Sequence, residues 1–372
     1  MTIKDMPRLH IGKHTAHIPI VQGGMGIGIS GAGLASAVSD QGGIGVISAV
    51  GLGMLESDSR THYEHTNQQA LIREIRAARS RTSGILGVNI MVALSDYDSL
   101  VLGAIDEGVD IIFLGAGLPL HFPEALPPER MRSLHTAIVP IVSSAKAAKL
   151  ILKYWTKRFQ RIPDGFVVEG PMAGGHLGFS PEQIDDPDYA LHRLIPEVAA
   201  AVTPYERRWE RRIPVIAAGG VYTGRDIHEF FHLGASGVQM GTRFVATHEC
   251  DADIRFKQAF VHAQKEDLTI IQSPVGLPGR AIRNKFLCDV ADGQKKPFTC
   301  PWKCLKTCDY TTSSYCIACA LNQARAGRLK HGFAFAGANA WRVDRIMSVR
   351  ELMNILTEEY HASVVDSECC FA

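Results

Sequence analysis

The stretch IPVIAAGGVYTGRDIHEFFHLGASGVQMGTRF, residues 213–244, decides the fold of this chain. It begins and ends with an apolar run, and helical signals from Thr223 to Gly234 lie between the two runs. Thr223 is a typical helix N-cap and Gly234 a typical helix stop. Neither run alternates with polar residues, which is typical of strands buried on both faces of a parallel sheet. The stretch therefore predicts one strand–helix–strand unit.

The same rhythm repeats along the chain before residue 245. Eight runs predict buried strands, at residues 18–24, 43–49, 84–92, 110–117, 137–144, 165–170, 213–220 and 237–244. Residues 66–81, 145–159 and 187–202 carry apolar residues at helical spacing. Eight such units predict an α/β protein with a (β/α)₈ barrel. A doubly wound open sheet is the alternative, and the count of eight favours the barrel.

The rhythm stops after residue 245. Helical patterns return at residues 252–265 and 316–327, residues 268–299 look irregular, and a last helix is expected to begin near Ser348. We therefore expect a barrel over residues 1–245 and a smaller, helical and irregular C-terminal cap over residues 246–372.

Composition limits the classes of partner. The 372 residues carry a net charge of +1, with 46% hydrophobic and 21% charged residues, as in a globular protein with a large core. Such a balance favours neither nucleic acid nor an anionic membrane. We expect a small-molecule substrate. Whether the protein forms a homodimer is not decided by the composition. The first residues, MTIKDMPRLH, lack a hydrophobic signal core, so the expected location is cytoplasmic.

Glycines gather where the predicted strands end. In a barrel these ends form the active face, and the loops after strands seven and eight commonly bind phosphate. Backbone amides of Gly219, Gly220, Gly241 and Thr242 are therefore candidate phosphate donors. The alternative is that these glycines only make tight turns. Two glycine sites on consecutive strands favour phosphate.

Several motifs together resemble the nitronate monooxygenase family, formerly 2-nitropropane dioxygenase, which includes flavin-dependent enoyl-acyl-carrier-protein reductases. The motifs are QGGMG at 22–26, GGH at 174–176, IPVIAAGG at 213–220 and GVQMGTRFVAT at 237–247, and the resemblance covers roughly residues 15–290. It implies a (β/α)₈ barrel that holds FMN. The residues that it places at the flavin are Gly24, Met25, Asn89, Gly174 and Gly175, with Gly219, Gly220, Gly241 and Thr242 at the phosphate.

His176 matches the active-site histidine of that family. An imidazole titrates near neutrality, so it can take a proton from a carbon acid or donate one. The alternative is an ordinary loop histidine, and the glycine context favours the catalytic role. Glu169 could bind flavin, orient a partner or cap a turn. Arg280 and Arg283 could bind the substrate or a nicotinamide cofactor, or simply join the cap to the barrel.

The resulting prediction is an FMN-dependent oxidoreductase that oxidises alkyl nitronates or nitroalkanes with O₂. One alternative is a flavin reductase of enoyl thioesters or quinones that uses NAD(P)H as co-substrate. An alternative of another class is a non-redox barrel that binds a phosphosugar or nucleotide.

Five cysteines between residues 300 and 319 distinguish this chain from the shorter members of the family. Their density favours thiolate ligation of zinc or an iron–sulfur cluster over free thiols. The expected metal ligands are Cys300, Cys304, Cys308 and Cys316, with Cys319 nearby. A cluster near the flavin would favour a reductase. His228 and His232, four residues apart, are expected on a solvated helix face.

Overall fold

The computed structural model describes residues 6–56 and 61–369 and shows a closed barrel of eight parallel strands. The strands are β3 (Ile20–Gln22), β4 (Ile44–Ser48), β5 (Ile85–Met91), β6 (Ile111–Gly115), β7 (Ala137–Val142), β8 (Phe166–Glu169), β10 (Val215–Ala218) and β11 (Gly237–Met240). They follow one another around the barrel, and β11 pairs with β3 to close it. All eight predicted strands and the predicted (β/α)₈ fold are confirmed, and the open sheet is excluded.

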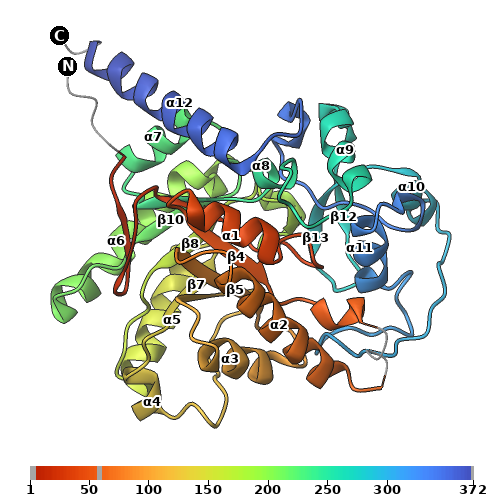
Figure 1. Ribbon diagram of the computed structural model, residues 1–372, viewed down its shortest axis with the longest axis horizontal. Coiled ribbons are helices and arrows are strands. Elements are labelled where there is room, and N and C mark those ends of the chain that lie inside the picture. The colour runs from red at the N-terminus through yellow and green to blue at the C-terminus, as the bar shows by residue number, and fades with distance from the viewer. Residues whose placement is uncertain (1–5, 57–60, 370–372) are drawn as a thin grey trace.

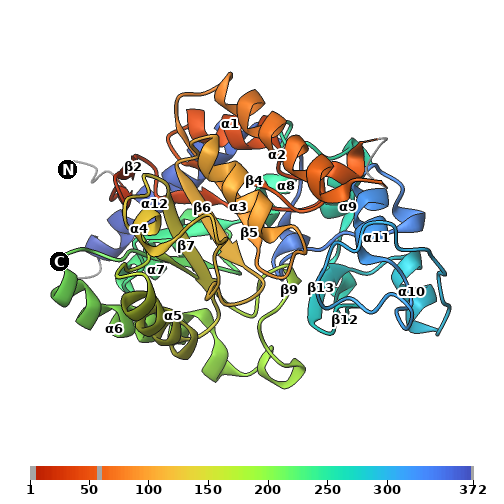
Figure 2. The same cartoon turned by 90° about the horizontal axis from the view of Figure 1, so that it is seen from below.

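Helices surround the barrel (Figures 1 and 2). They include α1 (Ala32–Asp40), α2 (Tyr63–Arg79), α3 (Tyr97–Asp106), α4 (Pro128–Arg132), α5 (Ala145–Arg158), α6 (Leu191–Trp209) and α7 (Gly224–His232). Thr223 caps α7 as the sequence predicts, because its side chain accepts a hydrogen bond from the Asp226 amide at 3.2 Å. Tight packing between strands and helices forms the larger part of the core.

A hairpin before the first barrel strand fills the lower end of the barrel. Its strands are β1 (Leu9–Ile11) and β2 (His14–Ala16). Leu9, Ile11 and Ala16 pack with apolar side chains from the barrel interior, among them Phe113 and Val139. Because this end is packed, the space for a ligand lies at the opposite end, where the strands finish.

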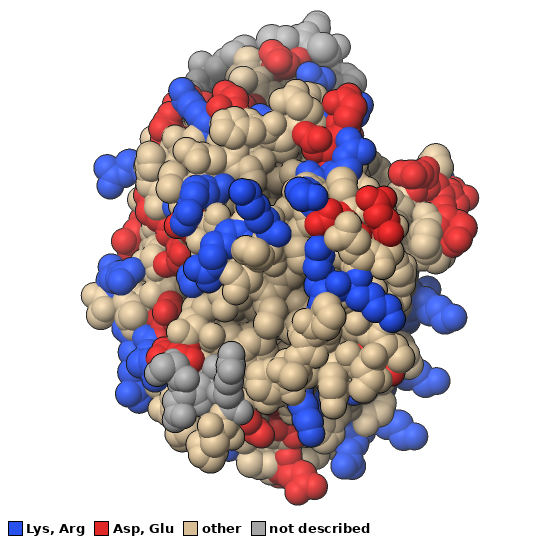
Figure 3. Space-filling model, turned by 90° about the vertical axis from the view of Figure 1, so that its right-hand side faces the viewer, with Lys and Arg blue, Asp and Glu red and all other residues tan. Residues whose placement is uncertain are grey.

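The chain after β11 forms α8 (Thr242–Val245), α9 (Ile254–His262), β12 (Leu268–Gln272), β13 (Pro278–Ile282), α10 (Lys285–Ala291), α11 (Ile317–Arg325) and α12 (Val349–Cys369). The face on which α9, α10 and α11 lie is seen in Figure 3, where Lys and Arg side chains gather around a largely uncharged centre. The expectation that residues 268–299 are irregular was wrong. β12 and β13 form a hairpin there, and β13 also pairs with the two-residue strand β9 (Gly175–His176).

The last helix returns to the barrel. α12 packs against α7 and α1, the position that the eighth helix of such a barrel occupies. Contact with α7 is close: a Cβ on Gly224 would lie 2.2 Å from the Leu356 carbonyl oxygen, and the Glu359 carboxylate accepts a hydrogen bond from the Gly224 amide at 2.7 Å. The predicted cap, residues 246–372, therefore includes a helix that belongs to the outer layer of the barrel.

Two sequence expectations concern membranes and location. Within the part of the chain that the structure describes, we find no helix of the length and apolarity that crossing a bilayer requires. The N-terminal stretch on which the location was predicted begins with residues 1–5, which lie outside the described residues.

Candidate active site

A cavity of about 1240 Å³ opens at the carboxyl ends of the barrel strands. All ten residues predicted to act on cofactor or substrate line it: Gly24, Met25, Asn89, Gly174, Gly175, His176, Gly219, Gly220, Gly241 and Thr242. They come from the ends of β3, β5, β8, β10 and β11, so the parallel barrel explains why segments far apart in sequence meet here. The structure brings the predicted set together, and the role of each residue remains a proposal.

Close backbone packing explains two of the glycines. A Cβ on Gly24 would lie 2.4 Å from the Asn89 Cβ, so only glycine lets the loop after β3 lie against β5. A Cβ on Gly174 would lie 2.5 Å from the Ala336 carbonyl carbon. Gly175 is different, because its φ is +84° and an added Cβ would meet nothing within 4 Å. The backbone at Gly175 therefore borders open cavity.

The two loops predicted to hold phosphate lie side by side. Ala218 pairs with Gln239 across β10 and β11, which brings residues 219–220 next to residues 241–242. Gly219 and Gly220 have φ values of +88° and +100°, which favour glycine. A segment from the C-terminal part of the chain joins both loops. The Asn339 side-chain amide donates to the Gly220 carbonyl at 2.6 Å, and the Gly337 amide donates to the Thr242 hydroxyl at 3.1 Å.

His176 is held by the hairpin that sequence reasoning missed. Its Nε2 lies 2.7 Å from the Ser273 hydroxyl, and β9 pairs with β13 at Gly279. The imidazole also meets the edge of Phe335, with 5.1 Å between the ring centroids. Burial lowers the pKa of His176 to about 4, so the ring is neutral at physiological pH. A neutral imidazole has a ring nitrogen that can accept a proton, and the lowered pKa makes this ring a weaker base than an exposed histidine.

Arg280 fixes the loop that carries these glycines. Its guanidinium donates to the carbonyls of Pro171 and Ala173, the latter at 2.8 Å. The side chain is only 8% exposed and does not appear among the residues that line the cavity. Of the two roles left open by the sequence, the structure favours joining the C-terminal part to the barrel. Arg283 lies at the surface and donates to the Glu266 carbonyl at 3.0 Å.

Glu169 ends β8 and lines the cavity. Desolvation raises the pKa of its carboxyl group to about 7, because burial disfavours the charged form. Glu169 and His176 thus have pKa values displaced in opposite directions: the acid is only partly ionised near neutral pH, and the base is neutral.

Sequence reasoning missed several residues of the cavity wall. They are Ser48, Tyr63, Ala336, Gly337 and Asn339. The hydroxyls of Ser48 and Tyr63 are buried in the wall without a hydrogen-bond partner among the described residues. Lys146 follows β7 on a basic helix, where the sequence predicts a solvated side chain, and it is exposed where it borders the cavity. Residues 336–339 follow no strand of the barrel and give no local signal.

The cysteine segment borders the same cavity. Cys304 lines it, and Cys304 and Cys316 pack against a cluster formed by Ile27, Met54 and Tyr63. Among the described residues, which include all five cysteines, no group of three or more His, Cys, Asp or Glu side chains is arranged to hold a metal ion. The metal site predicted at Cys300, Cys304, Cys308 and Cys316 thus has no support from the geometry. Cys316 caps α11, and its sulfur accepts a hydrogen bond from the Cys319 amide at 3.5 Å.

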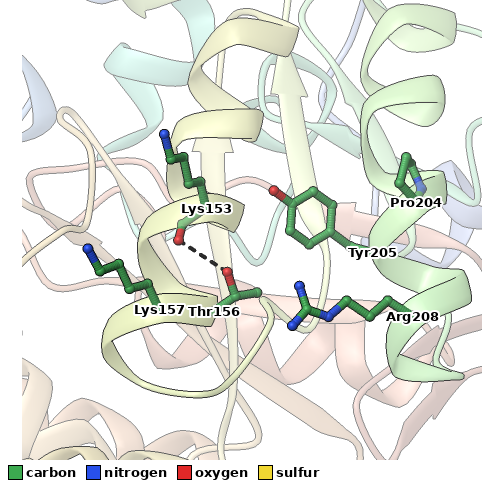
Figure 4. A pocket seen from close by; sticks show the side chains of 6 residues that line it. All are labelled: Lys153, Thr156, Lys157, Pro204, Tyr205 and Arg208. Carbon is green, nitrogen blue, oxygen red and sulfur yellow. Dashed lines mark hydrogen bonds between the residues drawn. The ribbon is translucent and has the colours of Figure 1, made fainter.

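Two other features lie outside the cavity. His228 and His232 lie on α7 and contact each other at 2.9 Å, and His228 also contacts Ser363 of α12 at 3.0 Å. A second hollow of about 510 Å³ lies between α5 and α6 (Figure 4) and is lined by Lys153, Thr156, Lys157, Pro204, Tyr205 and Arg208. None of the predicted site residues belongs to it.

Comparison with known proteins agrees with the fold. Residues 8–359 match the family model described as nitronate monooxygenase. A protein of Bacillus subtilis named probable nitronate monooxygenase is 26% identical over 360 residues, which is 92% of this chain and 95% of that protein. The structure of FabK from Thermotoga maritima superposes with a TM-score of 0.73 at 27% identity, covering 94% of this chain and 95% of that one.

Another relative is named for a different activity. The (3aS,4S,5R,7aS)-5-hydroxy-7a-methyl-1-oxo-octahydro-1H-indene-4-carboxyl-CoA dehydrogenase of Mycobacterium tuberculosis is 27% identical over 277 residues, or 74% of this chain. That match spans 66% of the mycobacterial protein, just under two thirds of its length. The family match covers nearly the whole chain, so this protein belongs to the nitronate monooxygenase family.

Proposed function

We propose that the protein is an FMN-dependent oxidoreductase that oxidises alkyl nitronates or nitroalkanes with O₂. The observation that carries the proposal is a neutral imidazole, His176, next to a glycine whose open face borders a large cavity. Family membership supports the redox class over a non-redox phosphosugar or nucleotide barrel.

The cavity fits FMN in three respects. Its volume of about 1240 Å³ exceeds the range of about 300–1,000 Å³ that single small-molecule ligands usually occupy, so it has room for a cofactor and a substrate. Gly175 offers backbone that a flat ring can approach. The buried Ser48 hydroxyl lacks a partner, which a polar ligand would supply.

We assign the phosphate of FMN to the loops after β10 and β11, at Gly219, Gly220, Gly241 and Thr242. Backbone amides at such loop ends are common phosphate donors in this fold. Gly24, Met25, Asn89, Gly174 and Gly175 would lie along the ring. When bound, the flavin would supply the electron-accepting chemistry that no protein side chain provides.

His176 would act on the substrate proton. In a nitroalkane the α-carbon carries an acidic hydrogen, and Nε2 or Nδ1 of a neutral ring can accept it. The hydrogen bond to Ser273 would hold the ring in place while the proton moves. A nitronate substrate has already lost this proton, and His176 would then orient the anion. Because burial raises its pKa to about 7, Glu169 would place less negative charge in the wall than an ordinary glutamate does.

An NAD(P)H-dependent reductase of enoyl thioesters or quinones is the second candidate. Two observations favour it: the cavity is large for a simple nitroalkane, and a relative at 27% identity is named as a carboxyl-CoA dehydrogenase. Both candidates require a small-molecule substrate and the same flavin.

Steady-state assays of the FMN-loaded protein separate the candidates. We expect O₂ consumption with an alkyl nitronate and no stimulation by NADH or NADPH. Reduction of a quinone or an enoyl thioester at the expense of NAD(P)H, without nitronate oxidation, would overturn the first candidate and support the second. A protein that binds no flavin would contradict both.

A further inference from the structure

Helix α7 carries two histidines that meet across one helical turn. His228 and His232 are four residues apart, and their Nε2 atoms lie 2.9 Å from each other. Their ring centroids are 4.5 Å apart, and the ring planes are inclined at 77°. The pair lies in the outer helix layer, where α7 runs beside α12 (Figure 1), and neither histidine lines the active-site cavity. Two ring nitrogens therefore converge at one point outside the site described above.

We propose that His228 and His232 form a two-histidine binding site for a divalent late transition metal, Ni²⁺ or Cu²⁺. Imidazole nitrogens are common ligands of these ions, and histidines at positions i and i+4 of a helix present two of them on one face. The inference does not depend on the proposed function, because the site lies outside the cavity.

The separation of the two nitrogens fits chelation of one ion. Bonds of the usual metal–imidazole length, about 2.0–2.1 Å, across a gap of 2.9 Å enclose an angle of about 90° at the metal. Neighbouring ligands make this angle in the square-planar and tetragonal sites of Cu²⁺ and Ni²⁺, whereas the ligands of tetrahedral zinc are about 109° apart. The geometry therefore favours Ni²⁺ and Cu²⁺ over Zn²⁺.

Helix α12 holds one of the two rings in place. Nδ1 of His228 lies 3.0 Å from the Ser363 hydroxyl, and the ring meets Tyr360 edge-on, with 5.5 Å between the centroids. When Nδ1 donates a hydrogen bond to Ser363, Nε2 of His228 keeps the lone pair that a metal needs. Histidines that bind metals usually have such a partner on their second nitrogen, which fixes the tautomer. Ser363 is thus a positioning residue of the proposed site.

The remaining ligands of the ion would come from solvent. Glu229 lies between the histidines in sequence but contacts His192 at 2.9 Å, and Asp226 takes part in the cap at the start of α7. Within the described part of the chain, no group of three or more His, Cys, Asp or Glu side chains is arranged to hold a metal ion. His232 is exposed, so water can reach the ion. The alternative is a hydrogen bond between the two rings, which needs no metal.

Calorimetric titration of the untagged full-length protein with Ni²⁺ tests the site. At about pH 7.5, above the ordinary histidine pKa of about 6.5, we expect saturation of one tight site per chain. Ni²⁺ is the probe because Cu²⁺ also oxidises thiols, and the chain has nine cysteines. Mg²⁺ prefers oxygen ligands and should not compete for the site.

Variants locate the ion on the chain. His228→Gln and His232→Gln should each weaken Ni²⁺ binding by about tenfold or more, since a single imidazole cannot chelate the ion. Ser363→Ala keeps both ligands and should weaken binding by about tenfold, because the His228 ring loses its partner. His192→Gln is the matched control. It removes an exposed histidine that contacts a carboxylate, and it should bind Ni²⁺ as the parent does.

Two results would overturn the proposal. Absence of saturable Ni²⁺ binding by the parent protein would leave a hydrogen bond as the whole purpose of the contact between the rings. Equal Ni²⁺ affinity of His232→Gln and the parent would place the ion on other histidines or on the cysteines. Because His232 is exposed, its replacement should leave the fold intact, which circular dichroism of the variant checks.

Discussion

At the scale of single residues, the chemistry depends on two groups whose environments displace their pKa values in opposite directions. Burial lowers the pKa of His176 to about 4 and raises that of Glu169 to about 7. Such paired displacement is typical of acid–base sites. The sequence identified His176 through its glycine context, but it left Glu169 open, because burial cannot be assigned from the letters GFVVEG alone.

Replacing His176 with alanine should abolish most turnover while FMN stays bound. A positioned proton-transfer residue contributes roughly 10²–10⁴-fold to rate, so kcat on a nitroalkane should fall by about that factor. Flavin absorbance after gel filtration serves as the control for cofactor loading. Turnover within a few-fold of the parent chain would remove His176 from the mechanism.

Glu169→Gln should change how stability depends on pH. A carboxyl group whose pKa is raised to about 7 in the folded state stabilises the fold below its usual pKa, and this contribution is lost as pH rises toward 7. In the cofactor-free protein, the free energy of unfolding of the parent should therefore fall relative to the variant between about pH 5 and pH 7. Equal pH dependence for the two proteins would show that Glu169 is not desolvated.

At the scale of elements, the hairpin β12–β13 supports the active site although it lies outside the barrel. It supplies Ser273 to the His176 ring and Arg280 to the glycine loop. A hairpin was hard to predict here, because Pro274, Pro278 and two glycines interrupt LTIIQSPVGLPGRAI, and these residue types are typical of loops. Pairing with β9 across about a hundred residues is a tertiary property, which a single-sequence pattern does not contain.

Arg280→Ala should destabilise the protein by about 2–3 kcal/mol. The change leaves two buried carbonyls without their charged donor, and hydrogen bonds to charged groups are worth about 1.5–3 kcal/mol. Arg283→Ala is the matched control, because Arg283 follows the same strand but lies at the surface, and its loss should cost no more than about 0.5 kcal/mol. Chemical denaturation measures both; equal losses would contradict the role of Arg280.

Gly241→Val should weaken the binding of FMN and leave the binding of riboflavin unchanged. The backbone at Gly241 has a φ of −109°, which a side chain tolerates, and its Cβ would lie 3.4 Å from the Met25 sulfur. Valine would then occupy the space that we assign to the phosphate, so FMN affinity should fall at least about tenfold. Riboflavin lacks the phosphate and is the internal control. Unchanged FMN affinity would place the phosphate elsewhere.

At the scale of the whole molecule, the eight-stranded barrel could be predicted from the sequence. The C-terminal segments that complete its cavity wall and its outer helix layer could not. Eight buried runs fixed the number and order of the strands, and the parallel fold brought all ten predicted cavity residues together. The C-terminal third has no such repeat. Residues 337 and 339 join the two proposed phosphate loops, and α12 closes the outer layer between α7 and α1. These contacts depend on how the chain returns to the barrel, which local patterns do not encode.

The most direct test of the account is an equilibrium titration of the cofactor-free protein with FMN, followed by flavin fluorescence, beside the same titration with riboflavin. We predict saturation at one FMN per chain and markedly weaker binding of riboflavin, because the loops at residues 219–220 and 241–242 would grip the phosphate. No saturable binding of FMN, or equal affinity for the two flavins, would contradict the central claim.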